Sequence, residues 1–342
     1  MVMLCGTTAS AVTVFDDFSD GNDTANPAWT RLDGAVASTG QTWDASSGAY
    51  HITAPGNSQV PGLENYGFAG AYTGPVYTDV RVTADIVDFP NTGFTGSYFA
   101  IAARLNGDDS LPTAENGIAL HGYSYVYEAS AAGGDGEMVL EVLHRDGLKD
   151  VGSEQVFLDN TKDYRFILEV VGQVMHGQVW ELDGAGNQVL LVGERTRDLI
   201  ANPPTFDHDD DDLTPEIPVQ LVSSGYSGVF GVGHVFLSDA DFTIDNFKTE
   251  SLAGDFDEDG DIDALDLSDW VASFGAGGGA DGDADGDSDG ADFLVWQRDL
   301  SAGPAAAAVP EPAALGMTAI AWAVVAGGRL TRRGRAERGK QG

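Results

Sequence analysis

The 342-residue chain is poor in cysteine and in basic residues. Its one cysteine, Cys5, cannot form a disulfide within the chain. Only 17 Lys and Arg stand against 54 Asp and Glu, which gives a formal net charge of −37. A surface of that sign repels nucleic-acid phosphates, so we expect no nucleic-acid partner. Bound metal ions are the expected cross-links where no disulfide is available.

Residues 12–250 contain no sustained apolar stripe with a helical period. Their apolar residues instead alternate with polar ones, which is the period of a strand with one buried face. The clearest of these segments are 79–89, 137–145, 164–171, 174–182 and 242–248. Many short strands without crossover helices predict an antiparallel β-sandwich, and a mainly β fold.

Local sequence features of this region resemble the concanavalin A-like and laminin-G-like jelly-roll family. They are Phe15-Asp16-Asp17-Phe18-Ser19-Asp20 followed by Trp29, the segment 43–50, and the closing segments 228–233 and 241–247. The resemblance implies two packed antiparallel sheets in which the first and last strands pair. It also implies a concave face of the kind that often binds glycans.

A row of aromatic residues is the candidate glycan site. His121, Tyr123, Tyr125 and Tyr127 would project to one face of a strand, where tyrosine rings could stack on sugar rings. The alternative is that these tyrosines pack inside the sandwich, since aromatic residues are common in strands.

Catalytic motifs are missing. Jelly-roll glycosidases place acids as Glu-x-Asp-x-x-Glu on one strand, because hydrolysis needs two carboxyls close together. Glu137 and Glu141 share a strand face but lack the remaining acid, and none of the six histidines shows metal-ligand spacing. We therefore expect no enzyme. A polysaccharide-degrading enzyme with an unusual site and a structural surface or matrix protein remain the alternatives.

Residues 255–292 are dominated by acids: fourteen acidic residues, thirteen of them Asp, and no Lys or Arg. Two twelve-residue loops each carry Asp at positions 1, 3, 5, 7, 9 and 12 and Gly at position 6, the pattern of a calcium loop. The loop acids are Asp255, Asp257, Asp259, Asp261, Asp263 and Asp266, then Asp281, Asp283, Asp285, Asp287, Asp289 and Asp292. An apolar helical pattern follows each loop, so we expect two Ca²⁺ ions and two helices that pack together. A solvated acidic linker is the alternative.

This loop–helix repeat resembles a dockerin type I module, which implies the same twelve acids as ligands and a cohesin-like docking partner. The sequence departs from the family at 264–265 and 290–291, where many dockerins carry a hydroxyl pair for cohesin contact, which puts cohesin itself in doubt. Position 8, usually a branched apolar residue in this pattern, is Ile262 in loop one but Ser288 in loop two. We therefore expect loop two to bind calcium more weakly.

The two ends of the chain look like targeting segments. Residues 1–11 end in Ala9-Ser10-Ala11, the small-x-small form of a signal-peptidase site, and are expected to be the remnant of a longer signal peptide. A lipoprotein anchor at Cys5 and a plain terminus are the alternatives.

At the other end, Val309, Pro310, Glu311 and Pro312 precede an apolar run at 313–328 and an arginine cluster. That order resembles the PEP-CTERM sorting signal, which implies a short transmembrane helix and processing by an exosortase-type enzyme. A simple tail anchor is the alternative.

The sequence thus predicts a signal-peptide remnant (1–11), a jelly-roll domain (12–250), a dockerin-like calcium module (251–302), a linker (303–308) and a sorting signal (309–342). The expected function is glycan or exopolysaccharide binding by an exported protein at the cell surface or beyond it.

Overall fold

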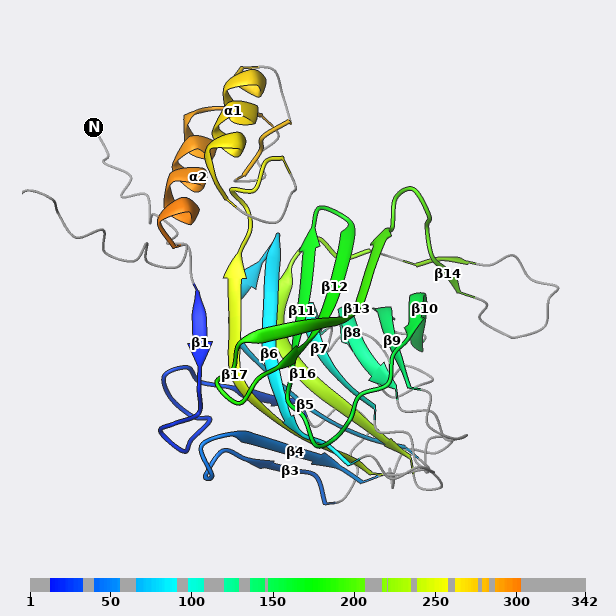
Figure 1. Ribbon diagram of the computed structural model, residues 1–342. Coiled ribbons are helices and arrows are strands. Elements are labelled where there is room, and N and C mark those ends of the chain that lie inside the picture. Colours follow the sequence, from blue (N-terminus) through cyan, green and yellow to red (C-terminus); the bar gives the residue numbers. More distant parts are fainter. Residues whose placement is uncertain are drawn as a thin grey trace, which may run out of the picture. The chain divides into compact units, whose positions relative to one another are not determined.

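The computed structural model describes most of residues 13–302 (Figure 1). The described ranges are 13–32, 40–55, 66–90, 98–107, 120–128, 136–144, 147–206, 217–219, 221–234, 239–257, 262–275, 279–282 and 287–302. The expected signal-peptide remnant, linker and sorting signal, with the expected apolar C-terminal helix, lie outside these residues. No helix in the described ranges is long and apolar enough to cross a membrane.

The fold is mainly β and is built from two antiparallel sheets, as the sequence predicted. The eight-stranded sheet has the order β13 (Gln188–Asp198), β12 (Val174–Leu182), β11 (Tyr164–Val171), β6 (Val80–Asp88), β17 (Ala240–Ser251), β4 (Tyr50–Ala54) and β3 (Thr42–Asp44), with β1 (Val14–Asp16) paired to β17. The seven-stranded sheet has the order β10 (Gly147–Gln155), β9 (Glu137–His144), β8 (Leu120–Glu128), β7 (Tyr98–Gly107), β16 (Gly225–His234), β5 (Tyr66–Tyr77) and β2 (Thr30–Leu32). A small hairpin joins β14 (Thr205–Phe206) to β15 (Ile217–Pro218).

All five predicted strand segments are strands, and the first and last strands pair as expected. β1 runs antiparallel to β17 with Asp16 opposite Phe247. β17 is a central strand, since it also pairs with β6 and β4. These pairings close the sandwich in the manner of a jelly roll.

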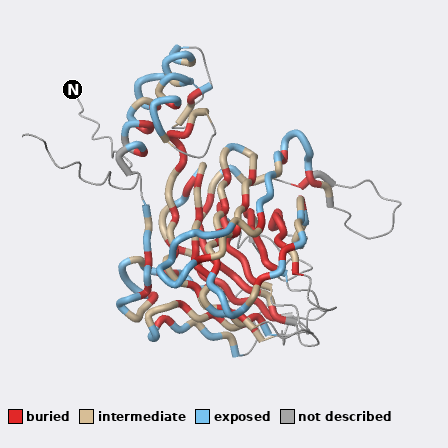
Figure 2. Tube along the Cα trace, in the orientation of Figure 1, coloured by how far each residue is buried: buried red, intermediate tan, exposed pale blue. Residues whose placement is uncertain are grey.

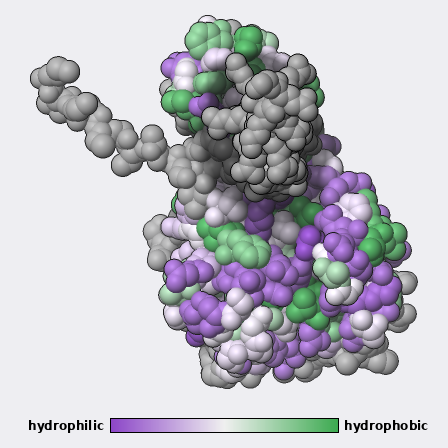
Figure 3. Space-filling view, turned by 60° about the vertical axis from the view of Figure 1, so that its left-hand side comes forward, coloured by the Kyte–Doolittle hydropathy of each residue, from purple (hydrophilic) through white to green (hydrophobic). Residues whose placement is uncertain are grey.

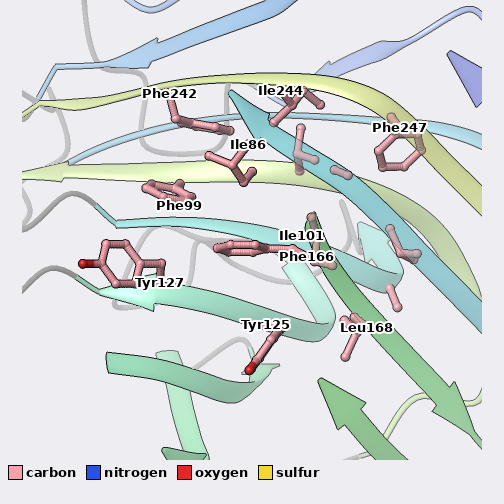
Figure 4. Close-up of a cluster of buried hydrophobic side chains, with 14 of the residues drawn as sticks. Ile86, Phe99, Ile101, Tyr125, Tyr127, Phe166, Leu168, Phe242, Ile244 and Phe247 are labelled. Atoms are coloured by element: carbon pink, nitrogen blue, oxygen red, sulfur yellow. The ribbon is translucent and has the colours of Figure 1, made fainter. Parts of the chain in front are cut away.

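The core lies between the sheets, where the inward side chains of both meet. Along β11 every second residue is buried, beginning with Tyr164, while the residues between them are partly exposed. Phe99 from the seven-stranded sheet packs against Phe166 and Phe242 from the other, with ring centroids 5.8 and 5.5 Å apart (Figure 4). Burial of each such side chain contributes about 1.5–3 kcal/mol, so this layer accounts for most of the fold's stability.

The two outer faces of the sandwich differ in chemistry. On the eight-stranded sheet the outer face carries ion pairs, such as Arg165 with Asp85 and Arg81 with Glu169. On the seven-stranded sheet the outer face carries a second apolar cluster, which includes Phe68, Val126 and Phe230. Figure 2 shows that the buried positions lie mainly in the strands. In the part of the chain that the structure describes, the seven-stranded sheet therefore has clusters of buried apolar side chains on both of its faces.

Two helices follow the sandwich in the chain, one after each acidic loop. They are α1 (Ala264–Ser273) and α2 (Gly290–Ala302). The ring of Trp270 contacts that of Phe293 at 5.0 Å, so the helices do pack together as expected. Two apolar residues of the helical pattern after loop one, Val271 and Phe274, are 62% and 57% exposed.

Candidate metal centres and binding surface

Three carboxylates of loop one converge on one point. Asp255, Asp257 and Asp266 each offer an oxygen, and these oxygens all lie within 4.8 Å of one another. They come from positions 1, 3 and 12 of the predicted loop, so the closing acid has been brought back to the loop's start. Asp255 and Asp266 are buried, which makes their charge costly without a nearby cation.

The start of α1 sets the position of Asp266. Asp263 is the N-cap, and its side chain accepts the Leu265 N–H at 2.6 Å. Asp266 in turn accepts the Asp263 N–H at 2.6 Å and the Phe256 N–H at 2.7 Å. One carboxylate thus caps the helix and ties the loop's end to its beginning.

Loop two repeats these capping bonds but brings together acids at positions 7, 9 and 12 instead of 1, 3 and 12. Asp287, Asp289 and Asp292 form a second group of carboxylates within 4.8 Å of one another. The Asp289 side chain accepts the Ala291 N–H at 2.6 Å, and Asp292 accepts the Asp289 N–H at 2.6 Å. The same two bonds at the same spacing make the two loops structural repeats.

The remaining predicted ligands divide into two groups. Asp259, Asp261, Asp283 and Asp285 lie outside the described residues. Asp263 and Asp281 are described but belong to neither group of three carboxylates. The groups that do form fit a hard divalent cation, because they offer only carboxylate oxygens and the stretch 255–292 contains no Lys or Arg.

Ser288, where the pattern favours an apolar residue, is fully buried. Its hydroxyl accepts the Ala280 N–H at 3.1 Å, and its carbonyl accepts the Gly275 N–H at 2.8 Å. Ser288 therefore fastens the end of α1 and the start of loop two. The weaker calcium binding expected of loop two stays a prediction.

The tyrosine row is real, but its predicted role as a glycan platform is wrong. Tyr123, Tyr125 and Tyr127 share one face of β8, and that face points into the core, where they are 0%, 0% and 1% exposed (Figure 4). The Tyr123 hydroxyl lies 2.7 Å from Gln173 Oε1 and accepts the Val222 N–H at 3.1 Å. Alternation fixes which residues share a face but not which face is inside, so the sequence could not decide this point.

His121 does not continue that row. It is partly exposed at the start of β8, and its ring lies 5.3 Å from the ring of His144. Gly122 separates it from the tyrosines with a φ of 155°, at a point where the pairing of β8 with β7 is irregular.

A different group of aromatic residues faces outward on the seven-stranded sheet. Tyr72 of β5 packs on Tyr226 of β16 with ring centroids 4.7 Å apart, and Tyr98 of β7 lies 6.2 Å from Phe230. The three tyrosines are partly exposed. We call Tyr72, Tyr98 and Tyr226 the outer aromatic group. Sequence reasoning missed it because its members are dispersed over three strands.

A buried carboxyl lies beside this group. Glu141 of β9 is 3% exposed, accepts a hydrogen bond from the Tyr98 hydroxyl, and lies 3.2 Å from the Ser124 hydroxyl. Burial raises the pKa of Glu141 to about 8, so it is protonated at neutral pH. Asp150 stands directly opposite on β10, and its pKa is raised by burial and by Glu137.

Glu141 and Asp150 are register partners on β9 and β10, so this strand pair places two carboxyl groups opposite each other. The expectation that the domain binds rather than hydrolyses stays a prediction.

The fold and these sites together define a jelly-roll β-sandwich followed by a pair of acidic loop–helix repeats. No protein-family model and no curated protein matches the chain.

Among solved structures, the carbohydrate-binding module CBM66 from Bacillus subtilis is similar at 15% identity and a TM-score of 0.37, over 65% of this chain and 95% of that one. The lectin UEA-II complexed with galactose is similar at 9% identity and a TM-score of 0.42, over 71% and 99%. A prokaryotic β-1,3-1,4-glucanase from a mouse hindgut metagenome is similar at 7% identity and a TM-score of 0.40, over 70% and 99%. At such values the function has to rest on this chain's own residues.

Proposed function

We propose that the protein is an exported surface protein that recognises glycan through its jelly-roll domain and binds two calcium ions through residues 255–292. The observation that carries the calcium role is the pair of carboxylate groups, Asp255 with Asp257 and Asp266, and Asp287 with Asp289 and Asp292. Each combines consecutive loop acids with one acid from the first helical turn. When bound, a calcium ion supplies positive charge to these carboxylates.

Calorimetric titration of the full chain with CaCl₂ tests this role. We expect about two ions per chain, and one fewer in each of the variants Asp266→Asn and Asp292→Asn. Asp269→Asn is the matched control, since Asp269 is an exposed acid of the same stretch that belongs to neither group. A chain that takes up no calcium, or loses no site in either variant, contradicts the role.

We propose the outer face of the seven-stranded sheet as the glycan site, in place of the buried tyrosines. The outer aromatic group supports this location, because partly exposed tyrosine rings on a sheet can stack on sugars while their hydroxyls form hydrogen bonds. Glu141 is buried and accepts a hydrogen bond from the Tyr98 hydroxyl, so it positions Tyr98 rather than contacting a sugar. The site residues we propose are therefore Tyr72, Tyr98 and Tyr226.

A glycan array probed with the full chain tests this surface. We expect binding that falls at least ten-fold in the double variant Tyr72→Ala/Tyr226→Ala. Trp180→Ala is the control, because Trp180 is a partly exposed aromatic residue on a strand of the other sheet. Equal loss in both variants contradicts this location, absence of any binding favours a structural surface protein, and release of reducing sugar establishes an enzyme.

We also propose that the module docks onto a protein partner, for which the family resemblance suggests a cohesin-like domain. Leu265, Val271 and Phe274 of α1 and Leu294 of α2 are more than half exposed, so the helices present apolar side chains to solvent (Figure 3). We also propose export past the cell membrane and processing by an exosortase-type enzyme, because Val309, Pro310, Glu311 and Pro312 resemble the PEP-CTERM signal. A cleaved C-terminus, read by mass spectrometry of the surface fraction, would support that route.

A further inference from the structure

The two loop–helix repeats are joined by a reciprocal pair of hydrogen bonds. Trp270 lies in α1, after loop one, and its indole N–H donates to the carbonyl of Asp289 in loop two at 2.8 Å. Trp296 lies in α2, after loop two, and its indole N–H donates to the carbonyl of Asp263 in loop one, also at 2.8 Å. Each helix is therefore anchored to the loop that precedes the other helix.

The two acceptor carbonyls belong to residues that also bond the closing acid of their own loop. Asp263 and Asp289 each lie three residues before the closing acid of their loop, and each donates its own N–H to that acid at 2.6 Å. An ion that holds the closing acid in place therefore also holds, through this N–H bond, the residue whose carbonyl accepts the indole N–H of the opposite helix. The path from one ion to the other helix runs through a single residue in each direction.

Ring packing is a second contact between the two repeats, separate from the indole hydrogen bonds. Phe293 bridges the two indoles, with ring centroids 5.0 Å from Trp270 and 5.6 Å from Trp296. Phenylalanine at positions 270 and 296 would keep an aromatic ring there but would lose both cross-links. The approach is close elsewhere too: a Cβ on Gly254, at the entry to loop one, would lie 2.9 Å from Trp296 Cα.

We propose that the indole N–H groups of Trp270 and Trp296 couple the two calcium loops, so that an ion in either loop raises the affinity of the other. This inference rests on the calcium role proposed above. Trp270 and Trp296 are positioning residues, since they act through the carbonyls of Asp289 and Asp263 rather than on the ion. A neutral hydrogen bond changes an equilibrium by about five-fold, so each indole should contribute about that factor. Coupling of this kind is reciprocal.

The experiment disables one loop and measures the other in the full chain. Asp257→Ala disables loop one and Asp287→Ala disables loop two, while both leave the capping residues intact. In chains with both indoles, we expect the intact loop to bind calcium several-fold more weakly than it does in the unmodified chain. Calorimetry with CaCl₂ alone gives both affinities, and this comparison needs no substitution of tryptophan.

The same measurements in the Trp270→Phe/Trp296→Phe background close a double-mutant cycle. There we expect that disabling one loop no longer changes the affinity of the other. Trp180→Phe is the control, because it removes an indole hydrogen bond to Gln178, outside the module. Helical circular dichroism at saturating calcium verifies that the variants are folded.

Three results overturn the coupling. One is two ions that bind independently in the unmodified chain, which would leave the calcium role intact. Another is an effect of loop removal that persists in full without the indoles, which would assign the coupling to ring packing. The third is a chain that binds no calcium, which would remove the proposed calcium role along with the coupling.

Discussion

The sandwich and the acidic module are stabilised by opposite means. In the sandwich, side chains such as Phe99, Phe166 and Phe242 are buried between two sheets, and the hydrophobic effect needs no ligand. In the module, Asp255, Asp266 and Asp292 are among the most buried residues, and their burial is favourable only with a counter-charge. We therefore expect the fold of the module, unlike that of the sandwich, to depend on bound calcium.

Calcium removal should separate the two regions most strongly. We expect a chelator to abolish the helices α1 and α2 while the sandwich keeps its structure, because a ligand that binds only the folded form contributes about 4 kcal/mol at a thousand-fold excess over its Kd. Hydrogen exchange followed by mass spectrometry would locate the change. Equal protection of residues 264–302 with and without chelator would disprove this dependence.

Truncation of a core side chain should destabilise the sandwich and leave the module unaffected. Phe99→Ala removes a fully buried ring and is expected to lower the free energy of unfolding of the sandwich by about 3–5 kcal/mol. Calcium affinity should not change. Phe157→Ala is the matched control, since Phe157 is 55% exposed, and thermal unfolding monitored by near-ultraviolet circular dichroism measures both. A similar loss in both variants would show that burial is not the cause.

The pH dependence of the sandwich should report the buried Glu141. Its folded pKa of about 8 lies above the ordinary value of 4.5, so the folded state retains a proton that the unfolded state loses. The contribution of Glu141 to stability is therefore fully present below about pH 4.5 and is lost as the pH rises towards 8, by up to about 1.4 kcal/mol per pH unit.

The variant Glu141→Gln should remove this dependence and leave the sandwich more stable at pH 8 than the unmodified chain. Glu194→Gln, at an exposed site, serves as its control. Denaturant titrations at pH 5 and pH 8 give both values, and an unchanged slope in Glu141→Gln would refute the assignment.

A smaller effect is expected at Ser288. Ser288→Ala deletes the hydroxyl that accepts the Ala280 N–H, at a cost of about 1 kcal/mol, and should weaken calcium binding by loop two about five-fold. Ser268→Ala, whose hydroxyl donates to Ala264 O on the surface of α1, should leave calcium binding unchanged. Calorimetry distinguishes the two, and an unaltered loop two would remove the role of Ser288.

The sequence predicted most of the fold, because alternation within segments such as 164–171 directly reflects one buried face. It also predicted the carboxylates that converge, because calcium loops have a fixed local spacing. It failed for Tyr123, Tyr125 and Tyr127, since the side of a sheet that becomes the interior depends on pairing between distant strands. The outer aromatic group and the reciprocal hydrogen bonds of Trp270 and Trp296 were missed for the same reason. Each is assembled from residues that lie far apart in the chain or in separate repeats.

The position of β17 has a mechanical consequence. This strand ends at Ser251, where the module begins, and it is held by β6 on one edge and by β4 and β1 on the other. A pull applied through the module would load these three strand pairings together along their length instead of opening them one bond at a time. The resistance to such a load is set by the rate of unfolding rather than by the equilibrium free energy of unfolding. The sandwich is therefore connected to the module through a strand that pairs with three others.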